Sequence, residues 1–180
     1  MPALKRPDVL MKHLTPANLF ERDARMDHWS IHGLGFLNHP NEQWVAWILE
    51  IELADSVPDQ IAEMLERVKA VAAYATCYYP LFAVAADELF RVQDAALCVA
   101  CQRLEAPKSK TGTYEKRIAW AVGHGLIAPD NAPRWQAARQ LRNYGAHRTK
   151  PGLIGPNDLL GSLRTASRFI GSLFDRLEGQ

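Results

Sequence analysis

Residues 142–147, Arg-Asn-Tyr-Gly-Ala-His, carry two side chains that suit phosphodiester chemistry. The Arg142 guanidinium matches the oxygens of a phosphate group, and the His147 imidazole can carry a proton near neutral pH. On an unbroken helix, a separation of five residues would point these side chains about 140° apart. Gly145 lies between them and can adopt the left-handed conformation that ends a helix. The sequence therefore predicts that the chain reverses at Gly145 and that both side chains can reach one phosphate.

The same residues also have a purely structural interpretation. Basic side chains in the last turn of a helix interact favourably with its dipole, by a few tenths to about 1 kcal/mol. Arg142 falls in the last turn of a helix predicted over residues 134–144, and Arg148 and Lys150 follow its predicted end. Spacing alone leaves both interpretations open.

Apolar residues recur at intervals of three and four through most of the chain after residue 55, which predicts helices. The segment 81–104 is apolar almost all round and is predicted to be a central, buried helix. With short connections and no convincing strand hairpin, the pattern indicates an all-α bundle of four to five helices. The predicted helices cover residues 59–77, 81–104, 113–122, 134–144 and 157–177.

The first 55 residues are weakly patterned and are predicted to form an N-terminal extension to a bundle over residues 56–180. Thr15-Pro16 could start a short helix, and residues 27–41 are typical of a loop. Residues 42–55 favour a helix, although their end alternates like a strand. The charge-free run 70–86 is shorter than a membrane-spanning helix needs, so it indicates a junction between two helices.

The predicted central helix carries a polar strip, because Asp87, Glu88, Arg91 and Asp94 are spaced by three and four residues. The favoured interpretation is an internally paired ion cluster that fixes the position of the helix. In the alternative, one carboxylate orients a catalytic arginine or histidine on a neighbouring helix. A buried carboxylate needs such a partner, because leaving it unpaired costs free energy.

The cysteines and the N-terminal histidines do not predict a metal site. Cys98 and Cys101 form a C-x-x-C inside a helical pattern, which favours core packing over zinc or redox chemistry. His28, His32 and His39 are favoured as loop residues, because no carboxylate completes a ligand set. We therefore expect neither metal nor cofactor. Three cysteines without a disulfide framework, and no secretory signal, favour the cytoplasm.

Charge is unevenly distributed along a chain whose formal net charge is only +1. Residues 1–102 carry eight Lys/Arg and fourteen Asp/Glu, a net −6, whereas residues 103–150 carry ten Lys/Arg and three Asp/Glu, a net +7. The favoured interpretation is that the acidic and basic parts pack against each other. The alternative is that the basic segment attracts a polyanion.

The order of these features resembles the HEPN superfamily, helical domains found in many toxin, defence and RNA-processing ribonucleases. Residues 142–147 match its Arg-(polar)-x-x-x-His motif. An Ala-rich helix precedes the motif, "KRI" and "GLI" lie between them, and a helix over 157–177 closes the chain, as in a largely uncharacterised HEPN-like branch. The resemblance covers about residues 60–178. One toxin branch has tyrosine two residues after the histidine, where this chain has Thr149.

The resemblance implies a metal-independent endoribonuclease. In it, His147 would act as acid and base, Arg142 would hold the phosphate, and Asn143 would orient the site by hydrogen bonding. Glu88 or Asp94 would assist from the long helix. The resemblance also implies a homodimer in which two motifs face each other across one cleft.

Three hypotheses for function follow. The first is an intracellular endoribonuclease of a toxin–antitoxin or phage-defence system, with RNA as substrate and an antitoxin or defence protein as partner. The second is a non-catalytic RNA-binding or adaptor module of the same fold. The third is a structural protein whose basic segment neutralises its acidic half. The residues predicted to bind RNA in the first two are Arg139, Arg148, Lys150, Arg164 and Arg168.

Overall fold

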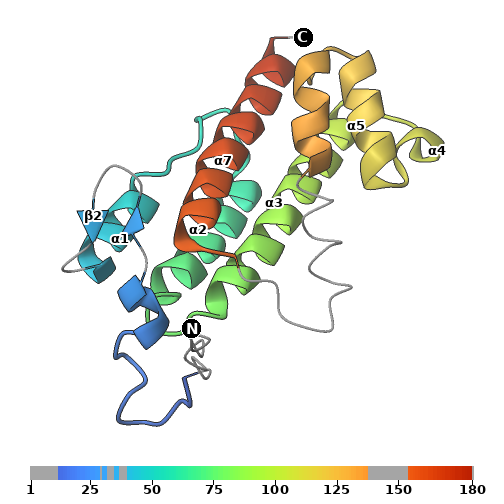
Figure 1. Ribbon diagram of the computed structural model, residues 1–180. Coiled ribbons are helices and arrows are strands. Elements are labelled where there is room, and N and C mark those ends of the chain that lie inside the picture. The colour runs from blue at the N-terminus through green and yellow to red at the C-terminus, as the bar shows by residue number, and fades with distance from the viewer. Residues whose placement is uncertain (1–11, 29, 32–34, 37–39, 138–153, 180) are drawn as a thin grey trace, which may run out of the picture.

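A computed structural model describes residues 12–28, 30–31, 35–36, 40–137 and 154–179 of the chain, and it confirms the all-α fold class. The helices lie side by side, with the N-terminal residues across one end (Figure 1). The elements are η1 (Ala24–His28), β1 (Ser30–Ile31), β2 (Gly35–Phe36), α1 (Pro40–Leu49), α2 (Asp59–Tyr74), α3 (Leu81–Arg103), α4 (Lys108–Thr111), α5 (Tyr114–Gly123), η2 (Pro129–Asn131) and α7 (Pro156–Glu178). Residues 132–137, between η2 and α7, are also helical.

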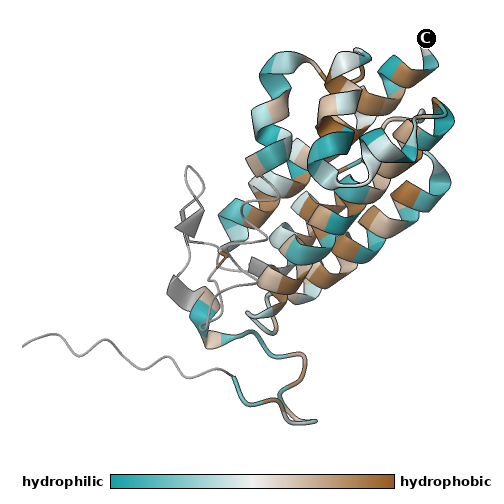
Figure 2. Cartoon of the chain, turned by 90° about the vertical axis from the view of Figure 1, so that its right-hand side faces the viewer, coloured by the Kyte–Doolittle hydropathy of each residue, from teal (hydrophilic) through white to brown (hydrophobic). Residues whose placement is uncertain are grey.

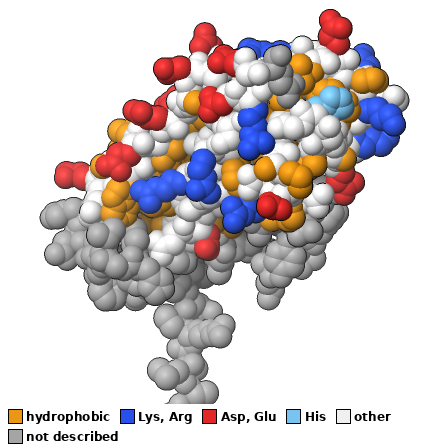
Figure 3. Space-filling view, turned by 90° about the horizontal axis from the view of Figure 1, so that it is seen from above, with side chains coloured by type: hydrophobic (Ala, Val, Ile, Leu, Met, Phe, Trp, Pro, Cys, Tyr) orange, Lys and Arg blue, Asp and Glu red, His pale blue; other side chains and the backbone are white. Residues whose placement is uncertain are grey.

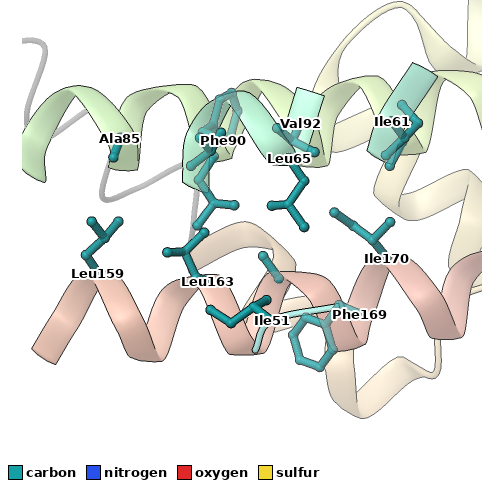
Figure 4. Close-up of a cluster of buried hydrophobic side chains, with 14 of the residues drawn as sticks. Ile51, Ile61, Leu65, Ala85, Phe90, Val92, Leu159, Leu163, Phe169 and Ile170 are labelled. Carbon is teal, nitrogen blue, oxygen red and sulfur yellow. The ribbon is translucent and has the colours of Figure 1, made fainter. Parts of the chain in front are cut away.

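The long helix α3 lies at the centre, as its sequence predicts, with α2, α5 and α7 packed around it. Most helices carry both hydrophobic residues, brown in Figure 2, and hydrophilic residues, in teal, because each helix buries one face and exposes the other. In the core (Figure 4), Ala85 and Phe90 of α3 face Leu159 and Leu163 of α7. Ala85 lies opposite Leu159 and Phe90 lies opposite Leu163, so residue numbers increase in the same direction along both helices and α3 and α7 are parallel.

The predicted junction within residues 70–86 is confirmed. α2 ends at Tyr74, a turn follows, and α3 begins at Leu81 directly after Pro80. Among the described residues, no helix is both long enough and apolar enough to span a membrane.

The start and end of α5 are set by short-range hydrogen bonds. The Thr113 hydroxyl accepts a hydrogen bond from the Lys116 N–H at 3.3 Å and thereby caps the helix. At the other end, Gly125 takes a φ of +73°, which glycine adopts without steric cost. The N–H groups of Leu126 and Ile127 then both donate to the Ala121 carbonyl, so the chain turns towards residues 132–137.

The core extends across the predicted division at residue 55. Met26, Trp44, Ile48 and Ile51 are buried in the same cluster as the bundle residues. The Trp44 indole N–H also donates to the Ala72 carbonyl of α2 at 2.7 Å. As a domain boundary the division stays a prediction, but the N-terminal part supplies some of the largest side chains of the core.

Residues 12–28, here called the N-terminal strap, are tied to the turn between α2 and α3 by polar contacts. The Asp23 side chain, 2% exposed, accepts hydrogen bonds from Arg25 Nε at 3.0 Å, Arg25 Nη2 at 2.8 Å and the Tyr79 N–H at 2.9 Å. The Lys12 ammonium donates to the carbonyls of Glu21 and Cys77. The strap is therefore held by a charge pair that is largely shielded from water, in addition to the buried Met26 side chain.

Three expectations for the N-terminal part are wrong in detail. Thr15 forms a local turn with Asn18 and does not start a helix. Residues 27–41 include a minimal antiparallel hairpin, in which Ser30 pairs with Phe36 and Ile31 with Gly35. The helix expected over 42–55 ends at Leu49, because the Ile51 carbonyl instead accepts from the buried Lys69 ammonium at 2.9 Å.

We predict that Asp23→Asn lowers the free energy of unfolding by about 3 kcal/mol at neutral pH, because it leaves the Arg25 charge without its partner. Burial alone would raise the pKa of Asp23, but the hydrogen bonds from Arg25 and Tyr79 outweigh it and hold the pKa below its ordinary value. This stabilisation is complete above the unfolded pKa of about 3.9 and is lost as the pH falls through the lower folded value. Urea unfolding at several pH values measures both effects.

The matched control is Asp55→Asn, at an exposed position in the turn after α1. It should change the free energy of unfolding by less than about 0.5 kcal/mol. Equal losses in the two variants, or an unchanged acid dependence in Asp23→Asn, would show that the strap is not held by this carboxylate.

We also predict that Glu105→Gly raises the free energy of unfolding by about 0.5–1 kcal/mol. Glu105 follows α3 with a φ of +51°, a left-handed conformation that costs a residue with a side chain about 1 kcal/mol or more. Glu63→Gly, on the exposed face of α2, should instead lower it by about 1 kcal/mol. Thermal unfolding of both variants tests whether the two effects have opposite signs.

Candidate functional site

The predicted catalytic residues Arg142, Asn143 and His147 lie outside the described residues, so their arrangement stays a prediction. Arg139, Arg148 and Lys150 lie outside them as well. The structure does describe what precedes and follows this segment. Residues 132–137 are helical, in agreement with the start of the helix predicted over 134–144.

Residues 132–137 are anchored to the bundle by a cluster of buried aromatic side chains. The Trp135 ring stacks on Phe169 of α7, with 6.0 Å between ring centroids. The Tyr114 hydroxyl donates to the Trp135 carbonyl at 3.1 Å, and its ring lies 4.9 Å from that of Phe90 in α3. Burial, together with the Asp94 charge, raises the pKa of Tyr114, so the hydroxyl keeps the proton that it donates. Three helices thus fix the start of the segment that leads to the predicted motif.

Asp94 pairs with an arginine on a neighbouring helix. Its carboxylate accepts from Nη2 and, at 3.2 Å, from Nε of Arg117 on α5. Arg117 Nη1 donates to the Thr111 carbonyl at 2.8 Å, so the guanidinium also holds α4 in place. The Arg117 side chain is 15% exposed and the Asp94 side chain 36%, so the pair is partly shielded from water. The alternative interpretation of the polar strip predicted a catalytic arginine or histidine as partner; Arg117 is an arginine on a neighbouring helix, and the catalytic part of that interpretation stays a prediction.

Arg117 is a site residue that the sequence patterns considered above did not identify. The signal was present, since Arg117 lies three residues after Tyr114 and one before Ile118, within the stripe that α5 buries. A basic residue on a buried stripe needs an acidic partner, and Asp94 on α3 is available.

Glu88 forms a different contact. It pairs with Arg91 of its own helix at 3.4 Å, and the two side chains are 43% and 66% exposed. Asp87 is exposed. The predicted polar strip therefore divides into a solvated pair, Glu88–Arg91, and a shielded pair between helices, Asp94–Arg117. Of the two proposed helpers, Asp94 is the one whose charge acts on Tyr114 in the aromatic cluster.

The predicted RNA-binding residues Arg164 and Arg168 are both exposed on α7. The Arg168 guanidinium carbon lies 5.6 Å from the centroid of the Phe169 ring, the ring on which Trp135 stacks. Arg168 is therefore beside the anchored start of the predicted helix. The described residues 103–137 contain six Lys/Arg and three Asp/Glu, so they contribute a net charge of +3 to the basic segment.

The C-x-x-C pair lies within α3, as predicted. Cys101 is buried, and this burial raises the pKa of its thiol to about 11, so it stays protonated at neutral pH. Cys98 is half-buried. Among the described residues, no group of three or more His, Cys, Asp or Glu side chains is arranged to hold a metal ion. The structure describes no side chain for His28, His32 or His39.

We predict that Asp94→Asn lowers the free energy of unfolding by about 1–3 kcal/mol, because the shielded Arg117 loses its charged partner. Glu88→Gln should change it by less than about 0.5–1 kcal/mol, because that ion pair is solvated. Chemical unfolding at neutral pH measures both. Equal effects would mean that the Asp94–Arg117 pair has no special structural role. A catalytic role for Asp94 requires, in addition, a loss of RNA cleavage at a temperature where the variant is fully folded.

In comparisons with known proteins, no protein-family model, no curated protein and no solved structure matches this chain. The HEPN resemblance therefore rests on the residues of the motif and on the order of the helices around it. The motif, the aromatic cluster that anchors residues 132–137 and the exposed arginines of α7 are the features from which a function can be argued.

Proposed function

We propose that this protein is a metal-independent endoribonuclease of toxin or defence type that acts in the cytoplasm. The observation that carries the proposal is the Arg142–His147 pair, separated by Gly145 and placed in the most basic part of the chain. Arginine and histidine can together perform phosphodiester transesterification without a metal, because one holds the phosphate and the other moves protons.

In the proposed reaction, His147 removes the proton from a ribose 2′-hydroxyl. The 2′-oxygen then attacks the adjacent phosphorus, and the bond to the 5′-oxygen breaks as that oxygen takes up the proton that His147 now holds. The products are a 2′,3′-cyclic phosphate and a 5′-hydroxyl. Arg142 stabilises the negative charge that develops on the phosphate oxygens, and Asn143 orients the site by hydrogen bonding.

The described residues support this proposal through position and charge. The Tyr114–Trp135–Phe169 cluster gives the motif-bearing segment a rigid start, and catalysis requires groups that are held in place. Arg168 lies on the same cluster and can contact the RNA backbone. We further propose a homodimer and an antitoxin or defence protein as regulator.

The second candidate is a non-catalytic RNA-binding module. It is favoured by the exposed Arg164 and Arg168, which need only bind phosphates. It predicts binding that weakens steeply with salt and no cleavage.

We predict that the purified protein cleaves RNA in the presence of EDTA. His147→Ala should lower the rate by about 10²–10⁴-fold, because a positioned general acid–base contributes about that factor. Arg142→Ala should lower it by about 10²–10³-fold, as expected for loss of a charge-stabilising donor. The products, separated by electrophoresis, should carry 2′,3′-cyclic phosphate ends.

His13→Ala is the matched control, because His13 is an exposed histidine of the N-terminal strap, and it should leave the rate unchanged. Cleavage that persists unchanged in His147→Ala would contradict the catalytic role proposed for His147. Salt-dependent binding without cleavage would establish the second candidate instead.

A further inference from the structure

Two stacked rings lie at the surface where α5 ends. The Trp120 and His124 rings are 3.8 Å apart between centroids, with 19° between their planes. Trp120 is partly buried and packs against the core, whereas His124 is exposed. The imidazole is therefore the solvent-side ring of the stack.

The His124 ring is held in one orientation. Its Nδ1 lies 2.8 Å from the Trp120 carbonyl oxygen. Because a carbonyl can only accept a hydrogen bond, Nδ1 must carry the proton. The His124 backbone N–H donates to the same carbonyl at 3.1 Å. A ring fixed in this way loses little conformational entropy when a flat ligand stacks on it.

Two cations are held at the same end of the bundle. Arg176 Nη1 donates to the carbonyl of Gly125, the residue next to His124, at 3.1 Å. Arg103 lies over the ring of Phe174, at 5.5 Å from its centroid. Figure 3 shows this end of the molecule, where a histidine lies between hydrophobic and Lys/Arg side chains.

Acidic residues also lie at this end of the bundle, and one of them is hydrogen-bonded to a residue outside its own helix. Asp175 accepts a hydrogen bond from the Ser56 hydroxyl at 2.7 Å, near the start of α2. Glu105 and Glu178 are exposed at the ends of α3 and α7. The positive charge next to the stack therefore comes from Arg176, whose guanidinium has further N–H donors beyond the one that Gly125 accepts.

We infer that the Trp120–His124 stack, with Arg176 beside it, binds an unpaired base and the adjoining phosphate of single-stranded RNA. The choice of RNA as the ligand rests on the proposed function. A flat aromatic surface with a cation beside it is the arrangement by which proteins hold single-stranded nucleic acids, because every base has a face that can stack. The competing explanation is that the stack only stabilises the end of α5.

The test uses a fluorescently labelled 2′-O-methyl oligoadenylate, which cannot be cleaved by 2′-hydroxyl attack. Fluorescence anisotropy at low salt in EDTA gives its Kd. His124→Ala should raise the Kd by about five- to a hundredfold, the effect expected for loss of one base stack. His124→Phe keeps a ring in place and should retain most of the affinity. His13→Ala, at the opposite end of the bundle, should bind like the unmodified protein.

An abasic oligonucleotide of the same length separates stacking from charge. His124→Ala should not change its Kd, whereas Arg176→Gln should weaken both oligonucleotides and reduce the salt dependence. Thermal unfolding confirms that each variant is folded. The inference is overturned if the unmodified protein binds neither oligonucleotide, if His124→Ala binds oligoadenylate normally, or if it weakens both probes equally.

The RNA cleavage assay keeps this inference distinct from the proposed function. If His124→Ala cleaves RNA and binds oligoadenylate normally, the inferred stacking site is refuted and the proposed ribonuclease activity stands. Binding that depends on His124, without any cleavage, would establish the stacking site in a protein that is not a nuclease.

Discussion

The structure depends on the burial of α3, whose wide apolar face cannot be left in water. Its buried residues are contacted by α2, α5 and α7, so three further helices must pack along it. When these helices cover the apolar surface of α3, its few polar side chains lie at the edges of that surface and pair there. Asp94 meets Arg117 where α5 crosses, and Glu88 stays at the solvent edge with Arg91. The positions of the charged pairs are thus a consequence of how the apolar surface is covered.

The long helices could be predicted from sequence because their burial pattern repeats every three to four residues. The predicted end of α3 and the predicted start of α7 lie within a residue of those observed. The short elements could not be predicted, since their form depends on residues far away in the chain. α1 ends where Lys69 of α2 takes up the Ile51 carbonyl, a contact across 18 residues that no local pattern indicates. The two-residue strands are likewise too short to show alternation.

For the candidate site, sequence identified residue types that suit a reaction but could identify neither the shielded partner of Asp94 nor the stacked pair at the end of α5. The buried stripe of α5 indicates that Arg117 needs an acidic partner, but only the packing of α5 against α3 shows that this partner is Asp94. Trp120 and His124 are four residues apart, which places them on one face, but whether their rings stack depends on rotamers. Pattern therefore predicts which side chains share a face, and packing decides which of them touch.

The parallel arrangement of α3 and α7 has a consequence for how the protein folds. Ala85 and Leu159 face each other in the core although 74 positions separate them in sequence. Helical bundles usually fold fast because neighbouring helices are joined by short loops and run antiparallel. Here the α3–α7 contact requires the chain between the two helices, residues 104–155, to bring its ends together. The entropic cost of this closure is not offset by contacts between α2 and α3, which form without it. We therefore expect α2 and α3 to associate early as a hairpin and α7 to dock late, which makes the docking of α7 the slow step of folding.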